Sequence, residues 1–108
     1  MKIAVIGAGA IGGYLGTLLA AAGEEVTFVA RGANLDALRA NGMKVTLEDG
    51  KEVRSTNARA CAAITEVGPQ DVVLLTVKAH QVAPIAPELP SLFHESTTVV
   101  TMQNGIPW

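Results

Sequence analysis

The stretch VIGAGAIGGYLG, from Val5 to Gly16, decides the fold of this chain, and two structures are compatible with it. In one, the glycines of Gly7-x-Gly9-x-x-Gly12 form a turn between a strand and a helix that cradles a pyrophosphate. In the other, the uncharged run is a membrane helix whose spaced glycines form a dimerisation face, or a signal peptide. The first is favoured, because the preceding residues, KIAVI, are typical of a short buried strand.

The composition is that of one globular domain. A chain of 108 residues can bury one modest core, and 49% of its residues are hydrophobic. A net charge of −2 provides no basic surface for nucleic acid. The single cysteine, Cys61, has no partner for a disulfide within the chain, which is typical of a reducing cytoplasm. The histidines stand apart from other ligand residues, so no metal site is expected.

Hydrophobic runs alternate with helix signals along the rest of the chain. Strands are expected over residues 2–6, 25–30, 59–62, 71–79 and 97–102. Helices are expected over residues 10–22, 35–40 and 80–93, with a single helical turn at 64–67. An antiparallel hairpin is expected over residues 43–55, turning at Asp49-Gly50.

Capping residues and prolines indicate where these helices begin, end or are distorted. Gly23 is expected to end the first helix in a left-handed conformation, and Asn34 to cap the second. Three prolines at regular spacing are expected to distort or shorten the third: Pro84, Pro87 and Pro90.

The alternation predicts a mostly parallel sheet with helices on both faces, the doubly wound, three-layer α/β/α fold of the Rossmann type. The strand at 71–79, the most hydrophobic after the first, is expected at the centre of the sheet. Residues 1–108 would then form one nucleotide-binding domain. Because the chain stops after the fifth such strand, an uncovered edge and apolar face are expected to favour self-association.

The end of the second strand carries a signal for the cofactor. In NAD-binding versions of this fold, an acid about twenty residues beyond the glycines binds the ribose hydroxyls. Here the sequence EVTFVAR has Arg31 at that position. A guanidinium pairs with a 2′-phosphate, and no carboxylate is present to repel it, so NADP is expected in preference to NAD. A solvated surface arginine is the alternative.

Four segments follow one another in a distinctive order and spacing: MKIAVIGAGAIGGYLG, EVTFVARG, DVVLLTVKAHQV and TMQNGIP. Together they resemble the amino-terminal part of the ketopantoate reductases (2-dehydropantoate 2-reductases), over essentially the whole chain. The glycine motif alone is unspecific, whereas TVKAHQ combined with QNG is distinctive. The resemblance implies an oxidoreductase that reduces 2-dehydropantoate to (R)-pantoate with NADPH, in the cytoplasmic pathway to pantothenate and coenzyme A.

Residue by residue, the resemblance assigns one continuous segment to the pyrophosphate: Gly7, Ala8, Gly9, Ala10, Ile11 and Gly12. It assigns Arg31 to the 2′-phosphate, Lys78 to the ribose and nicotinamide side of the cleft, and Asn104 to both cofactor and substrate. Ligands of open α/β sheets bind beyond the carboxyl ends of the strands, where Lys78 and Asn104 emerge, which supports both independently. Gln81 and Gln103 are weaker candidates for polar contacts nearby. By sequence alone, the ordinary interpretation of Lys78 is a solvent-exposed lysine at the end of a strand, and that of Asn104 is part of an Asn-Gly turn.

The resemblance also implies that a catalytic lysine and a substrate-binding acid belong to a helical carboxyl-terminal domain that this chain lacks. The chain is therefore expected to bind cofactor, with no catalytic residue of its own and little or no activity. The expected partner is a small 2-keto acid, without nucleic acid or membrane, and a homodimer is compatible with the sequence. The alternatives are another 2-keto acid dehydrogenase, a 6-phosphogluconate-type or glycerol-3-phosphate-type dehydrogenase, and a non-catalytic nucleotide-binding module. TVKAHQ argues against the phosphate-substrate types.

The remaining chemistry-bearing residues receive no role. His80 and His94 are expected at the surface without a carboxylate partner, so neither is assigned as a base. Cys61 lies among alanines and is expected to be a small buried side chain. Nothing in the sequence places Trp108.

Overall fold

The computed structural model describes residues 1–7, 10–30, 32–41, 44–46, 49–54, 58–77 and 82–101. The strands are β1 (Lys2–Ile6), β2 (Glu25–Val29), β3 (Lys44–Thr46), β4 (Glu52–Arg54), β5 (Arg59–Cys61), β6 (Val72–Leu75) and β7 (Thr98–Thr101). The helices are α1 (Ala10–Ala21), α2 (Gly32–Asn41) and α3 (Val82–Ile85), and the 3₁₀ segments are η1 (Ile64–Glu66) and η3 (Ala86–Leu92).

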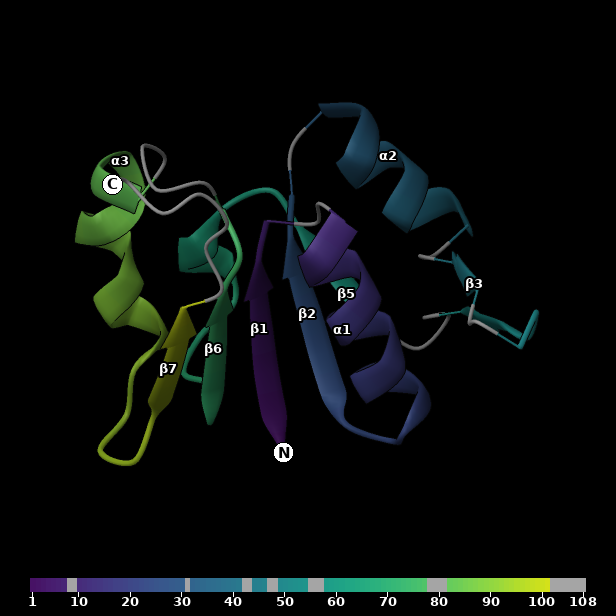
Figure 1. Cartoon of the computed structure of the whole chain (residues 1–108). Helices are drawn as coiled ribbons and strands as arrows, with labels where there is room; N and C mark the ends of the chain where they lie inside the picture. The colour runs from purple at the N-terminus through teal and green to yellow at the C-terminus, as the bar shows by residue number, and fades with distance from the viewer. Residues whose placement is uncertain are drawn as a thin grey trace, which may run out of the picture.

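Five strands form one sheet in the order β5-β2-β1-β6-β7, and every neighbouring pair is parallel (Figure 1). The predicted parallel sheet is therefore confirmed. The expectation that the strand at 71–79 lies at its centre is wrong, because β1 is the middle strand and β6 lies beside it. Val5 of β1 and Val73 of β6 are both fully buried, so hydrophobicity alone cannot rank the two strands.

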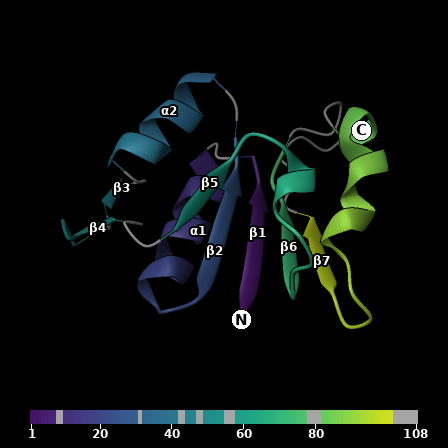
Figure 2. The same cartoon turned by 180° about the vertical axis from the view of Figure 1, so that it is seen from behind.

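Helical segments cover both faces of the sheet, as Figures 1 and 2 show. One face packs against α1 and α2 through a core cluster that contains Val5, Phe28, Ala20, Leu35 and others. The other face packs against η1 and η3 through a second cluster, with Ile64 and Leu92 on the helical side. Because parallel strands buried on both faces consist of nearly continuous apolar residues, this arrangement explains why β1 and β6 lack polar alternation. The predicted three-layer fold is confirmed.

Most of the predicted helix boundaries are close to the observed ones. Gly23 has a φ of +98°, its N–H donates to the carbonyl of Ala20, and the N–H of Glu24 donates to that of Leu19. This is the expected left-handed end of α1, in the hydrogen-bond pattern of a Schellman motif. Prolines shorten the third helix as expected, because α3 has four residues and continues as the 3₁₀ segment η3.

The expected cap of the second helix is wrong. The helix α2 begins at Gly32, so Asn34 lies within its first turn rather than ahead of it. Asparagine prefers the capping position but does not fix it. Gly32 has a φ of +59°, so the chain enters α2 through a left-handed glycine two residues ahead of Asn34. The hairpin is confirmed, since β3 and β4 pair antiparallel and Gly50 in the turn has a φ of +86°.

The alternative of a membrane helix at Val5–Gly16 is wrong, because this stretch is divided between β1 and α1. Across the ranges that the structure describes, we find no helix with the length and apolar character needed to cross a bilayer.

One predicted surface residue has a partner that the sequence did not indicate. The Nε2 atom of His94 lies 2.9 Å from a carboxylate oxygen of Asp71, so the expectation that His94 lacks a carboxylate partner is wrong. The other oxygen of Asp71 accepts a hydrogen bond from the backbone N–H of Lys2, at 2.8 Å. These contacts link the starts of β1, β6 and β7. The pairing of β6 with β7 brings His94 and Asp71 together from 23 residues apart, a separation that carries no local signal.

Stability is expected to fall in acid partly through Asp71. Its pKa lies below the ordinary value because the N–H of Lys2 and the side chain of His94 both favour the ionised carboxylate. A depressed folded-state pKa stabilises the fold above the ordinary pKa, about 3.9, and this contribution is lost as the pH falls through the folded-state value. Asp71→Asn should therefore lower the melting temperature at neutral pH, and the difference from the unmodified chain should shrink at about pH 3.

Thermal melts between about pH 3 and pH 7 would test this expectation. Asp36→Asn is a matched control, because Asp36 lies exposed on α2 and the change removes the same charge. A constant difference between Asp71→Asn and the unmodified chain across this range would contradict the stated role.

Candidate nucleotide-binding site

The parallel register brings the carboxyl ends of three strands to one edge of the sheet. Ile6, the last residue of β1, pairs with Val29 of β2 on one side and with Leu75 of β6 on the other. The residues that follow these strands therefore leave the sheet side by side, at the upper end in Figure 1. In open α/β sheets this is the edge at which ligands bind.

Gly7 begins the predicted phosphate-binding segment, and its conformation requires glycine. Its φ is +93°, which L side chains rarely adopt, and a Cβ atom there would lie 2.9 Å from Cγ1 of Val77. Its N–H donates to the carbonyl of Val29 at 2.9 Å. The chain thus turns sharply out of β1 while it stays bonded to β2.

Gly12 allows α1 to pack against the end of the sheet. A Cβ atom on Gly12 would overlap both the carbonyl oxygen of Gly7 and the hydroxyl of Thr76. One turn further along, a Cβ atom on Gly16 would overlap the ring of Phe28. The glycines spaced by four residues therefore permit close contact between helix and sheet, rather than between two membrane helices.

The first turn of α1 carries no charge that would repel an anion. It begins at Ala10, directly after the glycine turn, and carries no acidic residue. The N–H groups of a first helical turn have no partners within the helix, and the helix dipole makes this end positive. An anion can therefore bind here through the backbone alone, and a side chain at position 12 would displace the helix that supplies these groups.

Several predicted site residues lie outside the described residues. They are Ala8, Gly9, Arg31, Lys78, Asn104 and the weaker candidates Gln81 and Gln103, together with His80 and Trp108. Ala10 and Ile11 are described only as backbone within α1. In the chain, Arg31 follows β2 and Lys78 follows β6, and both strands end at the same edge of the sheet as β1.

Thr76, which follows β6, lies at the site but is not among the residues predicted from the sequence. Its hydroxyl lies 2.8 Å from the carbonyl oxygen of Ile6 and 2.6 Å from that of Gly7. The motif TVKAHQ contains this threonine, but the predicted site residues within it are Lys78 and the weaker candidate Gln81. No local pattern could have indicated this contact, because Gly7 and Thr76 lie 69 residues apart in the chain.

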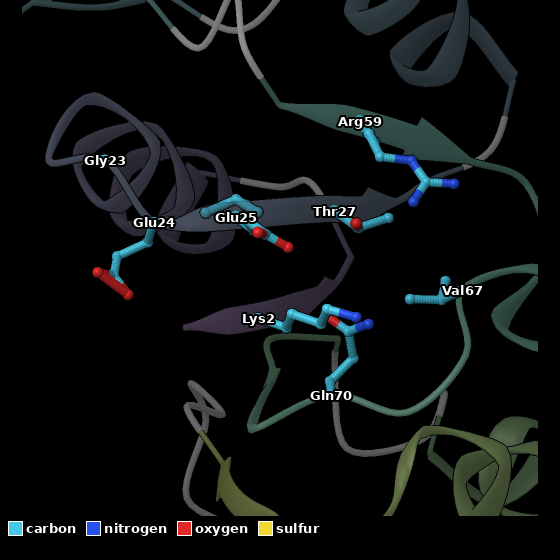
Figure 3. Close-up of a pocket in the computed structure, with 9 residues that line it drawn as sticks. Lys2, Gly23, Glu24, Glu25, Thr27, Arg59, Val67 and Gln70 are labelled. Carbon is cyan, nitrogen blue, oxygen red and sulfur yellow. The ribbon is translucent and has the colours of Figure 1, made fainter.

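A separate cavity of about 260 Å³ lies at the opposite end of the strands (Figure 3). Lys2, Thr27 and Arg59 extend into it from three neighbouring strands, and it is also lined by Gly23, Glu24, Glu25, Val26, Val67 and Gln70. Lys2, Glu25 and Arg59 are the first residues of β1, β2 and β5. The cavity is therefore at the amino edge of the sheet, away from the glycine turn.

Other candidate chemistry is limited within the described parts of the chain. Cys61 is buried, as expected, with 7% of its surface exposed. No group of three His, Cys, Asp or Glu residues among the described residues could hold a metal ion.

The matching family model identifies the class of protein. The model of the ketopantoate reductases PanE/ApbA matches residues 3–107, which is nearly the whole chain. The chain belongs to this family, and the resemblance noted from its four segments is confirmed.

Individual relatives agree with this assignment. A 2-dehydropantoate 2-reductase of Mesorhizobium japonicum is 50% identical, with 100% of this chain and 33% of the relative covered. The crystal structure of 2-dehydropantoate 2-reductase from Geobacter metallireducens matches with a TM-score of 0.87 at 34% identity, over 98% of this chain and 35% of that chain. A ternary structure of D-mandelate dehydrogenase with NADH and anilino(oxo)acetate has a TM-score of 0.78 at 31% identity, over 98% of this chain and 34% of that chain. The chain thus spans about a third of the length of these relatives.

Proposed function

We propose that this chain is the NADPH-binding part of a 2-dehydropantoate 2-reductase, an oxidoreductase of pantothenate biosynthesis. The observation that carries the proposal is the glycine turn between β1 and α1, in a chain whose family match spans residues 3–107. The close packing at Gly12 and the uncharged first turn of α1 fit the pyrophosphate of a dinucleotide. The proposed substrate is the 2-keto acid 2-dehydropantoate, reduced to (R)-pantoate.

We assign cofactor binding to this chain and catalysis to the part of the relatives that it does not span. The first turn of α1 binds the pyrophosphate, Arg31 binds the 2′-phosphate, Lys78 lies by the ribose, and Asn104 contacts cofactor and substrate. When bound, NADPH supplies the hydride, while the protein orients the cofactor. The catalytic lysine and the substrate-binding acid are proposed to come from a helical domain in the two thirds of the relatives that the chain does not span.

A second candidate is another 2-keto acid reductase that uses NADH. The match to D-mandelate dehydrogenase in complex with NADH supports it, at 31% identity. The absence of an acid at the position of Arg31 favours NADPH, because carboxylates at this position select NAD. The cofactor preference therefore distinguishes the two candidates without a substrate.

Side-by-side titration of the 108-residue chain with NADPH and NADH tests the proposal, with nucleotide fluorescence or calorimetry as the readout. We expect NADPH to bind about tenfold or more tightly than NADH, because only NADPH offers a 2′-phosphate to Arg31. Equal binding, or tighter binding of NADH, would contradict the NADPH proposal. The absence of binding to either nucleotide would contradict a competent cofactor site in this chain.

Exchange with a relative tests whether this chain supports the reaction with its proposed cofactor. This chain would replace the matching third of the Mesorhizobium japonicum reductase, to which it is 50% identical. The chimera is expected to reduce 2-dehydropantoate faster with NADPH than with NADH, because the relative supplies the substrate-binding acid while this chain supplies the cofactor site. A preference for NADH would favour the second candidate.

A further inference from the structure

The hydroxyl of Thr76 lies at the junction of β6, the glycine turn and α1. The N–H of Thr76 donates to the carbonyl of Ile6 at 3.0 Å, in continuation of the pairing between β1 and β6. The hydroxyl lies 2.6 Å from the carbonyl oxygen of Gly7, closer than to that of Ile6. Because the backbone N–H of Thr76 already donates to the carbonyl of Ile6, the hydroxyl of Thr76 can donate its one proton to the carbonyl of Gly7.

This contact completes a clamp on Gly7. The N–H of Gly7 donates to the carbonyl of Val29 in β2, while its carbonyl accepts from Thr76 beyond β6. The peptide groups on either side of Gly7 are therefore held from opposite sides of β1. Because a peptide unit is planar, bonding of the Gly7 carbonyl also fixes the plane of the peptide bond that leads into the turn.

The same hydroxyl lies against the start of α1. A Cβ atom on Gly12 would lie too close to both the carbonyl oxygen of Gly7 and the hydroxyl of Thr76. Three elements thus meet at one point, and the hydroxyl oxygen occupies the space that the missing side chain of Gly12 leaves. Thr76 is half-buried, so loss of its hydroxyl would leave the Gly7 carbonyl with reduced access to water as a replacement donor.

We propose that Thr76 is a positioning residue for the cofactor pyrophosphate, acting through the carbonyl of Gly7. The inference rests on the proposed dinucleotide-binding function. An unbonded Gly7 carbonyl is free to turn, and an oxygen directed toward the phosphates would repel them. The Thr76 hydroxyl holds this dipole toward β6 and keeps the positive end of α1 available to the anion.

Thr76→Val and Thr76→Ser separate the hydroxyl from the shape of the side chain. Valine keeps the shape and removes the donor, whereas serine keeps the donor. Thr76→Val is expected to weaken NADPH and NADH by the same factor, about 10- to 100-fold, because both cofactors carry the pyrophosphate. Thr76→Ser is expected to stay within about threefold of the unmodified chain.

Thr97→Val is a matched control for general loss of stability. The hydroxyl of Thr97 donates to the carbonyl of Gln70 at 2.6 Å, at the amino edge of the same strands. This variant also loses a threonine-to-carbonyl bond, but it should keep the affinity for both nucleotides at a temperature well below its melting transition. If Thr97→Val and Thr76→Val lose the same affinity, the proposed positioning role of Thr76 is wrong.

Hydrogen exchange in the nucleotide-free chain gives an independent readout. The N–H of Gly7 is hydrogen-bonded to Val29, so faster exchange of this amide in Thr76→Val, reversed in Thr76→Ser, would support the proposal that the Thr76 hydroxyl holds the peptide groups around Gly7. Unchanged exchange together with unchanged affinity in Thr76→Val would overturn it. If the chain binds NADPH and NADH equally, the NADPH proposal is wrong, but the measurements on the Thr76 variants still test the positioning role. Failure of the NADPH proposal can therefore be told apart from failure of the Thr76 proposal.

Discussion

Gly12→Ala is expected to weaken NADPH binding by at least about a hundredfold, because loss of two hydrogen bonds to a charged phosphate costs about 3 kcal/mol or more. The added methyl group would overlap the carbonyl oxygen of Gly7 and the hydroxyl of Thr76. The Gly7 carbonyl accepts a hydrogen bond from Thr76, which holds it in place, so it cannot move aside as the end of a flexible side chain could. The start of α1 must therefore move away from the turn, and its free N–H groups move with it.

Ala21→Gly provides a control of similar stability cost. Ala21 is exposed in the last turn of α1, and glycine there costs about 1 kcal/mol through backbone entropy without contact with the turn. Circular dichroism would establish a temperature at which both variants are folded, and NADPH titration would follow there. Binding by Gly12→Ala at the affinity of the unmodified chain would show that the glycine turn is not the phosphate site.

Arg31→Ala is expected to change cofactor choice rather than binding in general. The loss of a hydrogen bond between charged groups costs about 1.5–3 kcal/mol, which corresponds to about 10- to 150-fold weaker NADPH binding. NADH lacks the 2′-phosphate, so its affinity should change little. The measured quantity is the ratio of the two dissociation constants in each variant.

Arg59→Ala is the matched charge control for this experiment. It also removes one arginine, but Arg59 begins β5 and lines the cavity at the amino edge of the sheet. Its ratio of NADPH to NADH affinity should equal that of the unmodified chain. Equal losses for both cofactors in Arg31→Ala, or the same change of ratio in Arg59→Ala, would exclude the proposed contact with the 2′-phosphate.

Local signals explain why the part of the fold around the glycines could be predicted. Val5, Gly12 and Gly23 each have their observed roles as a buried strand residue, a close contact and a helix end. These roles depend on residues nearby in the sequence, where periodicity and backbone preference are informative. The contact of Thr76 with Gly7 joins residues 69 apart, and no local pattern reports such a pairing.

The same reasoning explains the wrong predictions. The central place of β1 depends on its pairing with both β2 and β6, and the contact of His94 with Asp71 depends on the pairing of β6 with β7. For the candidate site, the sequence identified Gly7 and Gly12, whose surroundings the structure describes. The roles of Arg31, Lys78 and Asn104 remain predictions that follow from their place after strands and from the family resemblance.

The central place of β1 has a consequence for the order in which the domain folds. Its pairing with β2 needs only the short segment that contains α1, whereas its pairing with β6 joins residues about 70 apart, as for Ile6 and Thr76. Closing the longer loop costs more chain entropy, so the unit of β1, α1 and β2 is expected to form first, during synthesis as well as in refolding. The end of β1 at Gly7 is then expected to form before the hydrogen bond from Thr76, which becomes possible only when β6 joins the sheet.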